Sequence, residues 1–358
     1  MRIVVDVSPL ALPRTGIGNY LRGMLAGLAA AAEGEHELVA FSVTGVPGRK
    51  RIEAALTGIR AERRLRVLPY ARGLRSLWSM LGRPRVEALA GRLDVFHFSD
   101  WMYPAQRDGL RATTIHDLVP LRFPEWTARR TRRMHGAKYE NARRTCGLVI
   151  ANSEFTARDV VERLGIPEER VRVAYPGVDP IFAPGGGGAE RARPYVLTVS
   201  TLELRKNLGT LVEAFGLLRG ERPELELVVA GAGRAELAAP GVVYAGFVPD
   251  EELARLYRGA AAFAYPSRFE GFGIPVVEAL ASGVPAVVSA HPSLDEAAGS
   301  AALRADPDSP EAWADALGRA LDSGDDLSAR GLEHARRFTW EACGRAVLHG
   351  YHDLYPSG

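Results

Sequence analysis

Short, almost continuously apolar stretches alternate along the whole chain with longer segments of helical periodicity. Strands of a parallel sheet carry apolar side chains on both faces when helices cover both faces. Alternation of such strands with helices also favours right-handed crossovers. We therefore predict an α/β protein with doubly wound sheets. The predicted strands are 2–8, 36–43, 64–70, 94–100, 111–117, 147–153, 170–176, 195–200, 225–231, 242–248, 261–267 and 285–290.

The same pattern occurs on both sides of a glycine- and proline-rich run, PGGGGAERARP at 184–194. Four consecutive glycines are typical of a linker, although a surface loop within one domain is the alternative. A chain of 358 residues also suits two domains better than one core. We predict a Rossmann-like domain at 1–183, a linker at 184–194 and a second Rossmann-like domain at 195–337. An amphipathic helix at 338–358, capped by Thr339, is expected to return to the first domain.

Composition excludes several classes of protein. A net charge of +2 does not indicate a nucleic-acid-binding protein. Cys146 and Cys343 are the only cysteines, so neither a disulfide framework nor a cysteine metal site is expected. No apolar run approaches the roughly 20 residues of a membrane-spanning helix, and the first residues do not resemble a signal peptide. We expect a cytoplasmic protein, with peripheral contact to the inner membrane face left open.

Basic residues are concentrated in the first half of the chain. Residues 49–85 contain eleven Lys and Arg residues and two Glu residues, and residues 128–144 add further arginines. An anionic or lipid-linked acceptor, or an anionic membrane surface, would explain this distribution. Solvated helix faces are the alternative.

The stretch SRFEGFGIPVVEALASGVP begins where a predicted buried strand ends. Gly271 and Gly273 permit a tight turn, and Pro275 suits the first turn of a helix. The start of such a helix binds anions through free N–H groups and the helix dipole. Glu270 and Glu278 flank this turn, and carboxylates accept hydrogen bonds from sugar hydroxyls. A nucleotide-sugar therefore fits the stretch, whereas a capping residue and a solvated helix residue are the structural alternative.

The same stretch resembles the E-x(7)-E signature of the retaining glycosyltransferases of family 4. Four other stretches resemble the family in the expected order, at 113–126, 149–180, 195–215 and 242–267. The resemblance implies the GT-B fold, in which two Rossmann-like domains face a cleft. It also implies transfer of a sugar from a nucleoside diphosphate to a hydroxyl acceptor, with retention of configuration and no metal or other cofactor.

Roles for individual residues follow from the resemblance. Glu270 would contact the transferred sugar and Glu278 the ribose. Lys206 would bind the diphosphate, with Arg205 beside it. Thr201 occupies a position where many relatives carry arginine, so Arg205 is expected to replace that phosphate contact.

Backbone groups complete the expected donor site. The main chain of Phe272, Gly273 and Ile274 would contact the sugar and phosphates of the donor. The main chain around Phe247 and Val248 would hold the base, although a glycine–aromatic strand end is common in other settings.

The first domain contributes two further predictions. Gly16 and Gly18, at the start of a helix, would let the donor phosphate and the acceptor approach the backbone. His116 ends a strand, and the resemblance places it near the reacting carbon as a neutral imidazole. A buried structural histidine is the alternative. Glu270, Lys206 and His116 are thus the predicted catalytic residues, and Asp117 is interpreted as structural.

Other functions are disfavoured. Asp306 and Asp308 form an Asp-x-Asp pattern, but Ser309 and a following proline indicate a helix start rather than a metal site. The glycine fingerprint of NAD-dependent oxidoreductases fails twice, at Leu21 and at Glu236. A GT-B sugar-nucleotide epimerase or hydrolase and a non-catalytic nucleotide-sugar-binding protein remain alternatives.

The donor is indicated by two short segments. TLELRKN at 201–207 and HDLVPL at 116–121 resemble bacterial mannosyltransferases that act on polysaccharide or antigen precursors. The expected donor is GDP-mannose, with UDP-sugars as the alternative.

Overall fold

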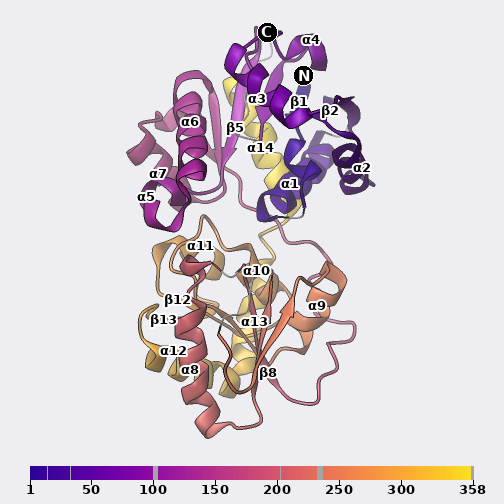
Figure 1. The fold of residues 1–358 in the computed structure, drawn as a ribbon. Coiled ribbons are helices and arrows are strands. Elements are labelled where there is room, and N and C mark those ends of the chain that lie inside the picture. Colours follow the sequence, from indigo (N-terminus) through magenta and orange to yellow (C-terminus); the bar gives the residue numbers. More distant parts are fainter. Residues whose placement is uncertain (14, 33, 100–103, 202, 232–236, 356–358) are drawn as a thin grey trace. The chain divides into compact units, whose positions relative to one another are not determined.

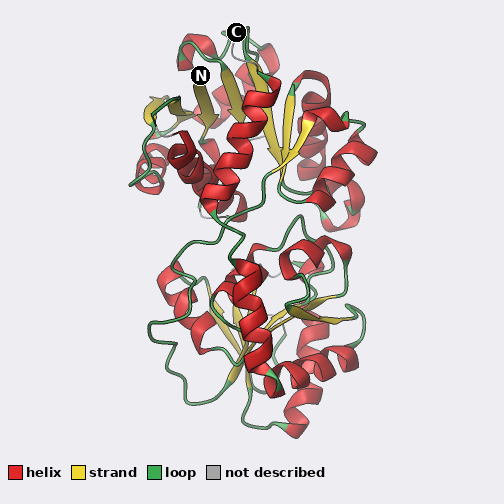
Figure 2. Cartoon of the chain, turned by 180° about the vertical axis from the view of Figure 1, so that it is seen from behind, coloured by secondary structure: helices red, strands yellow, loops and turns green. Residues whose placement is uncertain are grey.

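The computed structural model describes residues 1–13, 15–32, 34–99, 104–201, 203–231 and 237–355. Glu236, which breaks the second glycine fingerprint, lies outside the described residues. The chain forms two compact units (Figure 1). The first unit comprises Met1–Gly177 and Thr339–Gly358, and the second comprises Val178–Phe338. Each unit is an α/β layer structure with helices on both faces of a sheet (Figure 2).

The first unit contains a parallel sheet of seven strands in the order β3-β2-β1-β4-β5-β6-β7. Every predicted strand of this half is present, with small differences at its ends. The strands are β1 (Arg2–Asp6), β2 (Glu37–Thr44), β3 (Glu62–Val67), β4 (Val95–Phe98), β5 (Leu110–Ile115), β6 (Leu148–Ala151) and β7 (Val171–Val173). The helices are α1 (Gly16–Ala32), α2 (Val46–Ala55), α3 (Ala71–Leu81), α4 (Glu87–Ala90), α5 (Val119–Arg122), α6 (Arg129–Thr145), α7 (Glu154–Leu164) and α14 (Trp340–Leu354).

The apolar character of the strands follows from burial on both faces. In β1, Ile3 and Val5 belong to a core cluster that also includes residues of α1 and α14. Val4, between them, belongs to the cluster on the opposite face. Neighbouring side chains of one strand thus enter two different cores, which explains why the strand sequence shows no polar alternation.

The last helix, α14, packs against α1 through small residues. Thr339 caps α14, because its hydroxyl accepts a 3.1 Å hydrogen bond from the backbone N–H of Ala342. A Cβ atom added to Gly27 of α1 would lie 1.7 Å from the carbonyl oxygen of Trp340. A Cβ atom added to Gly344 would lie 2.0 Å from the carbonyl carbon of Gly27. The two backbones therefore touch, and α14 is part of the first unit.

The boundary between the units differs from the predicted linker. It lies between Gly177 and Val178, whereas 184–194 belongs to the second unit. The backbone N–H of Ala189 donates a 2.8 Å hydrogen bond to the carbonyl oxygen of Arg255, and Arg191 pairs with Glu226 at 2.7 Å. The glycine run is thus held to the second unit as a surface loop, because its flanking residues bond to a helix and a strand of that unit.

The second unit contains a parallel sheet of six strands in the order β10-β9-β8-β11-β12-β13. The five predicted strands are present, and β13 is an addition because its short sequence ALRA has little apolar contrast. The strands are β8 (Tyr195–Val199), β9 (Glu226–Ala230), β10 (Val242–Gly246), β11 (Ala262–Tyr265), β12 (Ala286–Ser289) and β13 (Ala302–Ala305). The helices are α8 (Leu208–Glu221), α9 (Asp250–Gly259), α10 (Ile274–Ala281), α11 (Asp295–Ala298), α12 (Pro310–Asp322) and α13 (Gly324–Ala335).

Because the backbones of α1 and α14 touch, adding one methyl group at their contact should destabilise the protein. Gly27→Ala should lower the free energy of unfolding by about 2 kcal/mol or more, because the backbones must separate. The control is Gly216→Ala on α8, where nothing lies within 4 Å of an added Cβ atom. That variant should be neutral or more stable by about 0.5–1 kcal/mol, since alanine is the better helix former. Urea unfolding followed by circular dichroism measures both. Equal stability of the two variants would contradict the close crossing.

Candidate functional site

The sheet of the second unit reverses its strand order between β8 and β11. These two strands are direct neighbours, with Phe263 opposite Leu197. Ligands of doubly wound sheets bind beyond the carboxyl ends of the strands at such a reversal. The segments that leave this point are the short 3-10 helix η4 (Leu204–Lys206) after β8 and the turn that precedes α10 after β11. They carry Arg205, Lys206, Glu270, Phe272 and Gly273 of the predicted donor-binding residues.

The Glu270 carboxylate is the centre of a dense hydrogen-bond network. Its Oε1 atom accepts hydrogen bonds from Lys206 Nζ at 2.5 Å, from the Ser267 hydroxyl at 2.6 Å and from the Tyr265 hydroxyl at 3.0 Å. Its Oε2 atom accepts one from Arg205 Nη1 at 2.9 Å. The network joins the segment after β8 to the segment after β11, so residues more than sixty positions apart form one site.

The cluster is buried, and its charges compensate one another. Lys206 is 8% exposed and Glu270 is 9% exposed. Burial alone would raise the pKa of Glu270, but the charges of Lys206 and Arg205 and the hydrogen bonds to the carboxylate outweigh it and lower the pKa to about 2. Burial lowers the pKa of Lys206, while the Glu270 charge opposes that effect. A buried carboxylate held by two cations is an ionised group at neutral pH.

Helix α10 begins beside this cluster, as predicted. Gly273 precedes the helix with a φ of 103°, a conformation that favours glycine, and Pro275 lies in the first turn. No side chain caps the helix, but Pro275 has no N–H and the N–H of Val276 donates to the carbonyl oxygen of Gly273 at 2.9 Å. The N–H of Ile274 and the helix dipole are thus what the start of α10 offers to an anion. Glu278 lies in the second turn of the helix, and its Oε2 atom accepts a 3.0 Å hydrogen bond from the Tyr257 hydroxyl.

Arg205 and Thr201 share an acidic neighbour. Arg205 Nε donates to Glu203 Oε2 at 2.9 Å, and the Thr201 hydroxyl donates to Glu203 Oε1 at 2.9 Å. Arg205 thus bridges Glu203 and Glu270 at the edge of the network. From this position Arg205 could make the phosphate contact that relatives make with an arginine at position 201. That role of Arg205 stays a prediction.

The other predicted donor-binding residues lie on the same unit. Phe247 is exposed and Val248 is partly exposed, and both follow β10 directly. The Phe272 side chain is buried against Phe338, with 5.2 Å between ring centroids. Phe272 therefore offers only its main chain to a ligand, as the sequence analysis assumed. Ile274 is the first residue of α10 and is partly exposed.

His116, Gly16 and Gly18 belong to the first unit. His116 directly follows β5, and its ring packs edge-on against Tyr20 with 4.8 Å between centroids. Burial, with the charge of Lys138, lowers the pKa of His116 to about 3, so its imidazole is neutral at physiological pH. Gly16 begins α1, and the N–H of Gly18 donates to Thr15 Oγ1 at 3.2 Å.

The carboxylate of Asp117 has a structural contact. It accepts a 2.9 Å hydrogen bond from the backbone N–H of Val119, at the start of α5. This contact agrees with the structural interpretation of Asp117.

The sequence analysis missed three supporting residues of the Glu270 network. Tyr265 and Ser267 hold the carboxylate, and the Ser293 hydroxyl accepts a 3.1 Å hydrogen bond from the backbone N–H of Glu270. Tyr265 and Ser267 carried a usable signal, since polar side chains at the end of a buried strand lie at a ligand-binding edge. Ser293 carried none, because its contact with Glu270 depends on tertiary folding.

The described part of the chain contains no group of three or more His, Cys, Asp and Glu residues that could hold a metal ion. Asp306 and Asp308 lie in the turn before α12, where Ser309 caps the helix by accepting from the N–H of Ala312 at 3.1 Å. Asp308 also pairs with Arg268. Both acids therefore have local partners. Within the same described residues, no helix is long and apolar enough to span a bilayer.

Two family models together match nearly all of the chain. The model for glycosyltransferase family 4 matches residues 14–182, and the model for glycosyl transferases group 1 matches residues 186–338. The chain is also 30% identical to the O-antigen chain mannosyltransferase B of Escherichia coli, over 98% of this chain and 99% of that protein. The chain belongs to the group 1 glycosyltransferases of family 4. The family predicted from the sequence is thereby confirmed.

Further similarities agree with this glycosyltransferase assignment. The chain is 33% identical to a D-inositol 3-phosphate glycosyltransferase of Nocardioides over 57% of this chain and 53% of that protein. The structure resembles a sucrose-phosphate synthase from Thermosynechococcus elongatus, with a TM-score of 0.72, 19% identity and full coverage of both chains. It also resembles Anabaena HepE in complex with UDP-glucose, with a TM-score of 0.68, 15% identity and 98% coverage of both chains. The predicted α/β GT-B fold is confirmed.

The low pKa of Glu270 predicts a pH-dependent contribution to stability. A carboxylate whose pKa falls from 4.5 to about 2 on folding stabilises the protein above pH 4.5 and loses this effect as the pH falls toward 2. The full effect is about 3 kcal/mol. Glu270→Gln should therefore be less stable than the native protein at neutral pH, and the difference should shrink below pH 4.5.

Melting temperatures measured by calorimetry across this pH range test the effect. Glu333→Gln, which changes an exposed acid paired with Arg336, is the control and should follow the native pH profile. A difference between Glu270→Gln and the native protein that stayed constant down to pH 2 would show that Glu270 is not the titrating group.

Proposed function

We propose that this glycosyltransferase moves mannose from GDP-mannose to a hydroxyl acceptor, with retention of configuration and without a metal ion, in the synthesis of a glycan, glycolipid or polysaccharide. The observation that carries the proposal is the buried cluster of Lys206, Arg205 and Glu270 beside the uncapped start of α10. It combines cations and N–H donors for a diphosphate with an ionised acceptor for sugar hydroxyls. Such a mixture matches a sugar diphosphate better than either a free sugar or a free phosphate.

A bound diphosphate would change the partners within this cluster. Its oxygens would compete with Glu270 for the hydrogen bonds of Lys206 and Arg205, and the N–H of Ile274 at the start of α10 would add a further donor. Lone pairs of the Glu270 carboxylate would then become available to hydroxyls of the transferred sugar. Glu278 would accept hydrogen bonds from the ribose. The same cations would stabilise the charge that develops on the leaving diphosphate.

Retention without a covalent intermediate fits the state of Glu270. A carboxylate with four hydrogen-bond donors and a pKa of about 2 is a weak nucleophile. In the proposed front-face route, the bond between the sugar carbon and the phosphate oxygen breaks while the acceptor oxygen bonds to the same carbon on the same face. The leaving phosphate accepts the proton of the acceptor hydroxyl. His116 would position the sugar or the acceptor as a neutral imidazole.

The choice of mannose is supported by the relatives. The Escherichia coli protein that matches over nearly the whole length is a mannosyltransferase of the O-antigen chain. The UDP complexes of Anabaena HepE favour a uridine donor instead, but the identity of 15–16% supports the fold alone. Because basic residues are concentrated in the first half of the chain, we also propose that the acceptor is anionic or lipid-linked, with the chain acting in the cytoplasm.

Substitution of the cluster predicts a loss of turnover. Lys206→Ala and Glu270→Ala should each reduce kcat about 100-fold or more, because each removes a charged contact to the transition state. The matched controls are Arg319→Ala and Glu333→Ala, which remove exposed charges on α12 and α13. Initial rates with GDP-mannose and a lipid-linked oligosaccharide acceptor measure the effect. Near-native kcat in both cluster variants would refute the assigned roles.

The donor can be identified without knowledge of the acceptor. GDP-mannose should raise the melting temperature more than UDP-glucose, ADP-glucose or the free diphosphates, since a ligand that binds only the folded state stabilises it. A thermal-shift panel at equal ligand concentrations measures this order. A larger rise in melting temperature with UDP-glucose would indicate that the donor is a UDP-sugar and not GDP-mannose. Consumption of the donor at the same rate with and without acceptor would instead indicate an epimerase or hydrolase.

A further inference from the structure

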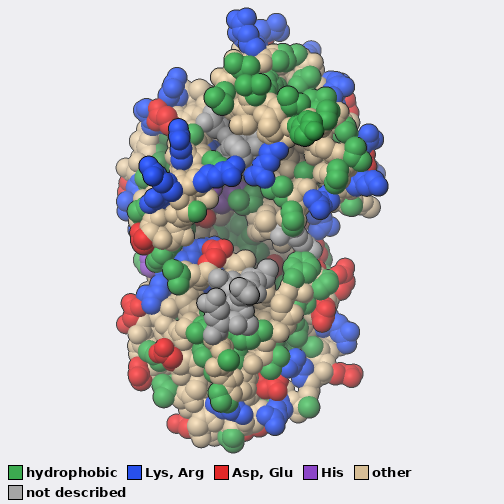
Figure 3. Space-filling view, viewed as in Figure 1, with side chains coloured by type: hydrophobic (Ala, Val, Ile, Leu, Met, Phe, Trp, Pro, Cys, Tyr) green, Lys and Arg blue, Asp and Glu red, His purple; other side chains and the backbone are tan. Residues whose placement is uncertain are grey.

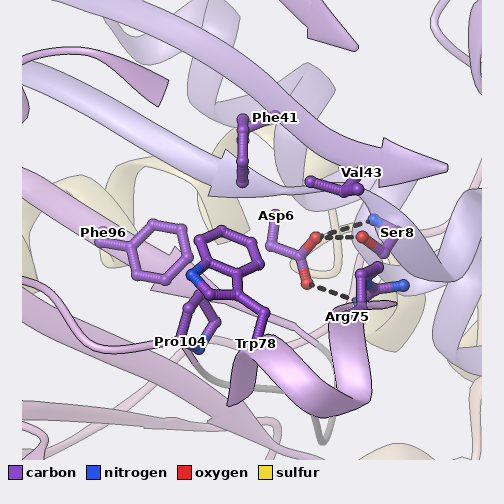
Figure 4. A pocket seen from close by; sticks show the side chains of 8 residues that line it. All are labelled: Asp6, Ser8, Phe41, Val43, Arg75, Trp78, Phe96 and Pro104. Atoms are coloured by element: carbon purple, nitrogen blue, oxygen red, sulfur yellow. Dashed lines mark hydrogen bonds and ion pairs between the residues drawn. The ribbon is translucent and has the colours of Figure 1, made fainter. Parts of the chain in front are cut away.

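Helix α3 of the first unit is anchored through one of its faces. Trp78 packs edge-on against Phe41 with 6.4 Å between ring centroids, and its indole N–H donates to the carbonyl oxygen of Pro84. Arg75 Nη2 lies 3.9 Å from the Asp6 carboxylate at the end of β1. Figure 4 shows Trp78 directed from α3 toward Phe41, and Arg75 toward Asp6. Ala71 is buried on the same face. These contacts fix the helix to the sheet.

A second apolar stripe on α3 faces the solvent. Leu74, Leu77 and Leu81 follow one another at intervals of three or four residues, so they lie on one side of the helix. All three are exposed, Leu77 to 50%, and so are Met80 beside them, to 81%, and Tyr70 just before the helix. Figure 3 shows hydrophobic side chains gathered on the part of the first unit that carries α3 in Figure 1. A helix face in contact with water is normally polar, so a contiguous exposed apolar stripe indicates an interaction surface.

The surroundings of the stripe are positively charged. The chain contains no Asp or Glu from Arg63 to Val86. Arg72, Arg83 and Arg85 are exposed, and the described residues provide none of them with an ion pair. Exposed apolar side chains flanked by uncompensated arginines are the features of a helix that lies in the interface of an anionic membrane.

A hollow of about 500 Å³ lies beside the first turn of α3. Its lining includes Ser8, Thr44, Gly45, Tyr70 and Arg72, together with the apolar residues Ala11, Leu12 and Val43. The Ser8 hydroxyl is held by Asp6 and Ser42, so the guanidinium of Arg72 is the group that would receive a lipid phosphate at this hollow. The acyl chains of the same lipid would meet the leucines of α3.

We propose that α3, with the hollow beside it, binds the surface of an anionic phospholipid bilayer. Leu74, Leu77, Met80 and Leu81 enter the boundary between headgroups and acyl chains, while Arg72, Arg83 and Arg85 contact lipid phosphates. The side chains of the stripe itself, Leu74, Leu77 and Leu81, offer no aromatic ring for a base to stack on, which favours a lipid over a nucleic acid. The proposal is independent of the transferase chemistry, because lipid binding needs no nucleotide-sugar.

The test is co-sedimentation of the full chain with vesicles, without nucleotide. Vesicles of phosphatidylglycerol and phosphatidylcholine in equal amounts should bind the protein at least about tenfold more tightly than vesicles of phosphatidylcholine alone, since each arginine near an anionic surface contributes about fivefold. Binding should weaken strongly in about 1 M salt, which screens charges beyond about 3 Å. The double variant Leu77→Asp/Met80→Asp should bind at least about tenfold more weakly, and Arg72→Glu about fivefold or more.

The matched control is Leu217→Asp, which places the same charge on a 51% exposed leucine of α8 in the second unit. This variant should bind like the native protein. All variants are compared by circular dichroism, and the substituted residues are exposed, so folding should be preserved. Failure of the native chain to bind anionic vesicles at low salt would overturn the proposal. It would also be overturned if only Arg72→Glu weakened binding, since the protein would then adsorb to vesicles by charge alone, without entry of the leucines into the bilayer.

Discussion

A buried carboxylate must be matched by cations and hydrogen-bond donors, and this requirement shapes the second unit. Glu270 receives hydrogen bonds from Lys206, Arg205, Tyr265 and Ser267, which come from the segments after two neighbouring strands. Leaving any one charge alone in this environment would cost about 3–5 kcal/mol. The network therefore fixes the two segments relative to each other. It also places the start of α10 beside two cations.

The first unit shows a similar arrangement at the corresponding point of its sheet. Its strand order reverses between β1 and β4, and β1 ends in Asp6, a buried acid near Arg75 of α3. In both units, an acid near the end of a strand holds a cation from another segment. The consequences differ, because Lys206 and Arg205 remain at a helix start suited to phosphate, whereas Arg75 serves to anchor α3.

One helix of the first unit exposes apolar side chains that do not enter the core. Helix α3 packs Ala71 and Trp78 against the sheet and presents a row of leucines to the solvent. By contrast, α14 buries Cys343, Val347 and Tyr351 against α1 and the sheet, helped by the glycines that let the two backbones touch. Both helices have a packed apolar face, but only α3 also exposes a row of leucines. The arginines around α3 favour an anionic partner for its exposed stripe.

The sequence by itself determined the α/β class, twelve of the strands, the glycine turn before α10 and the family, because these depend on local periodicity and on motifs in a fixed order. Glu270, Glu278 and Lys206 could be named for the same reason. Only the tertiary structure decided that the boundary lies at Gly177, that Ala302–Ala305 forms a strand, and that Tyr265, Ser267 and Ser293 support Glu270. It also decided which apolar stripe is buried and which is exposed. The physical reason is that these features depend on contacts between segments distant in the chain, which local patterns do not encode.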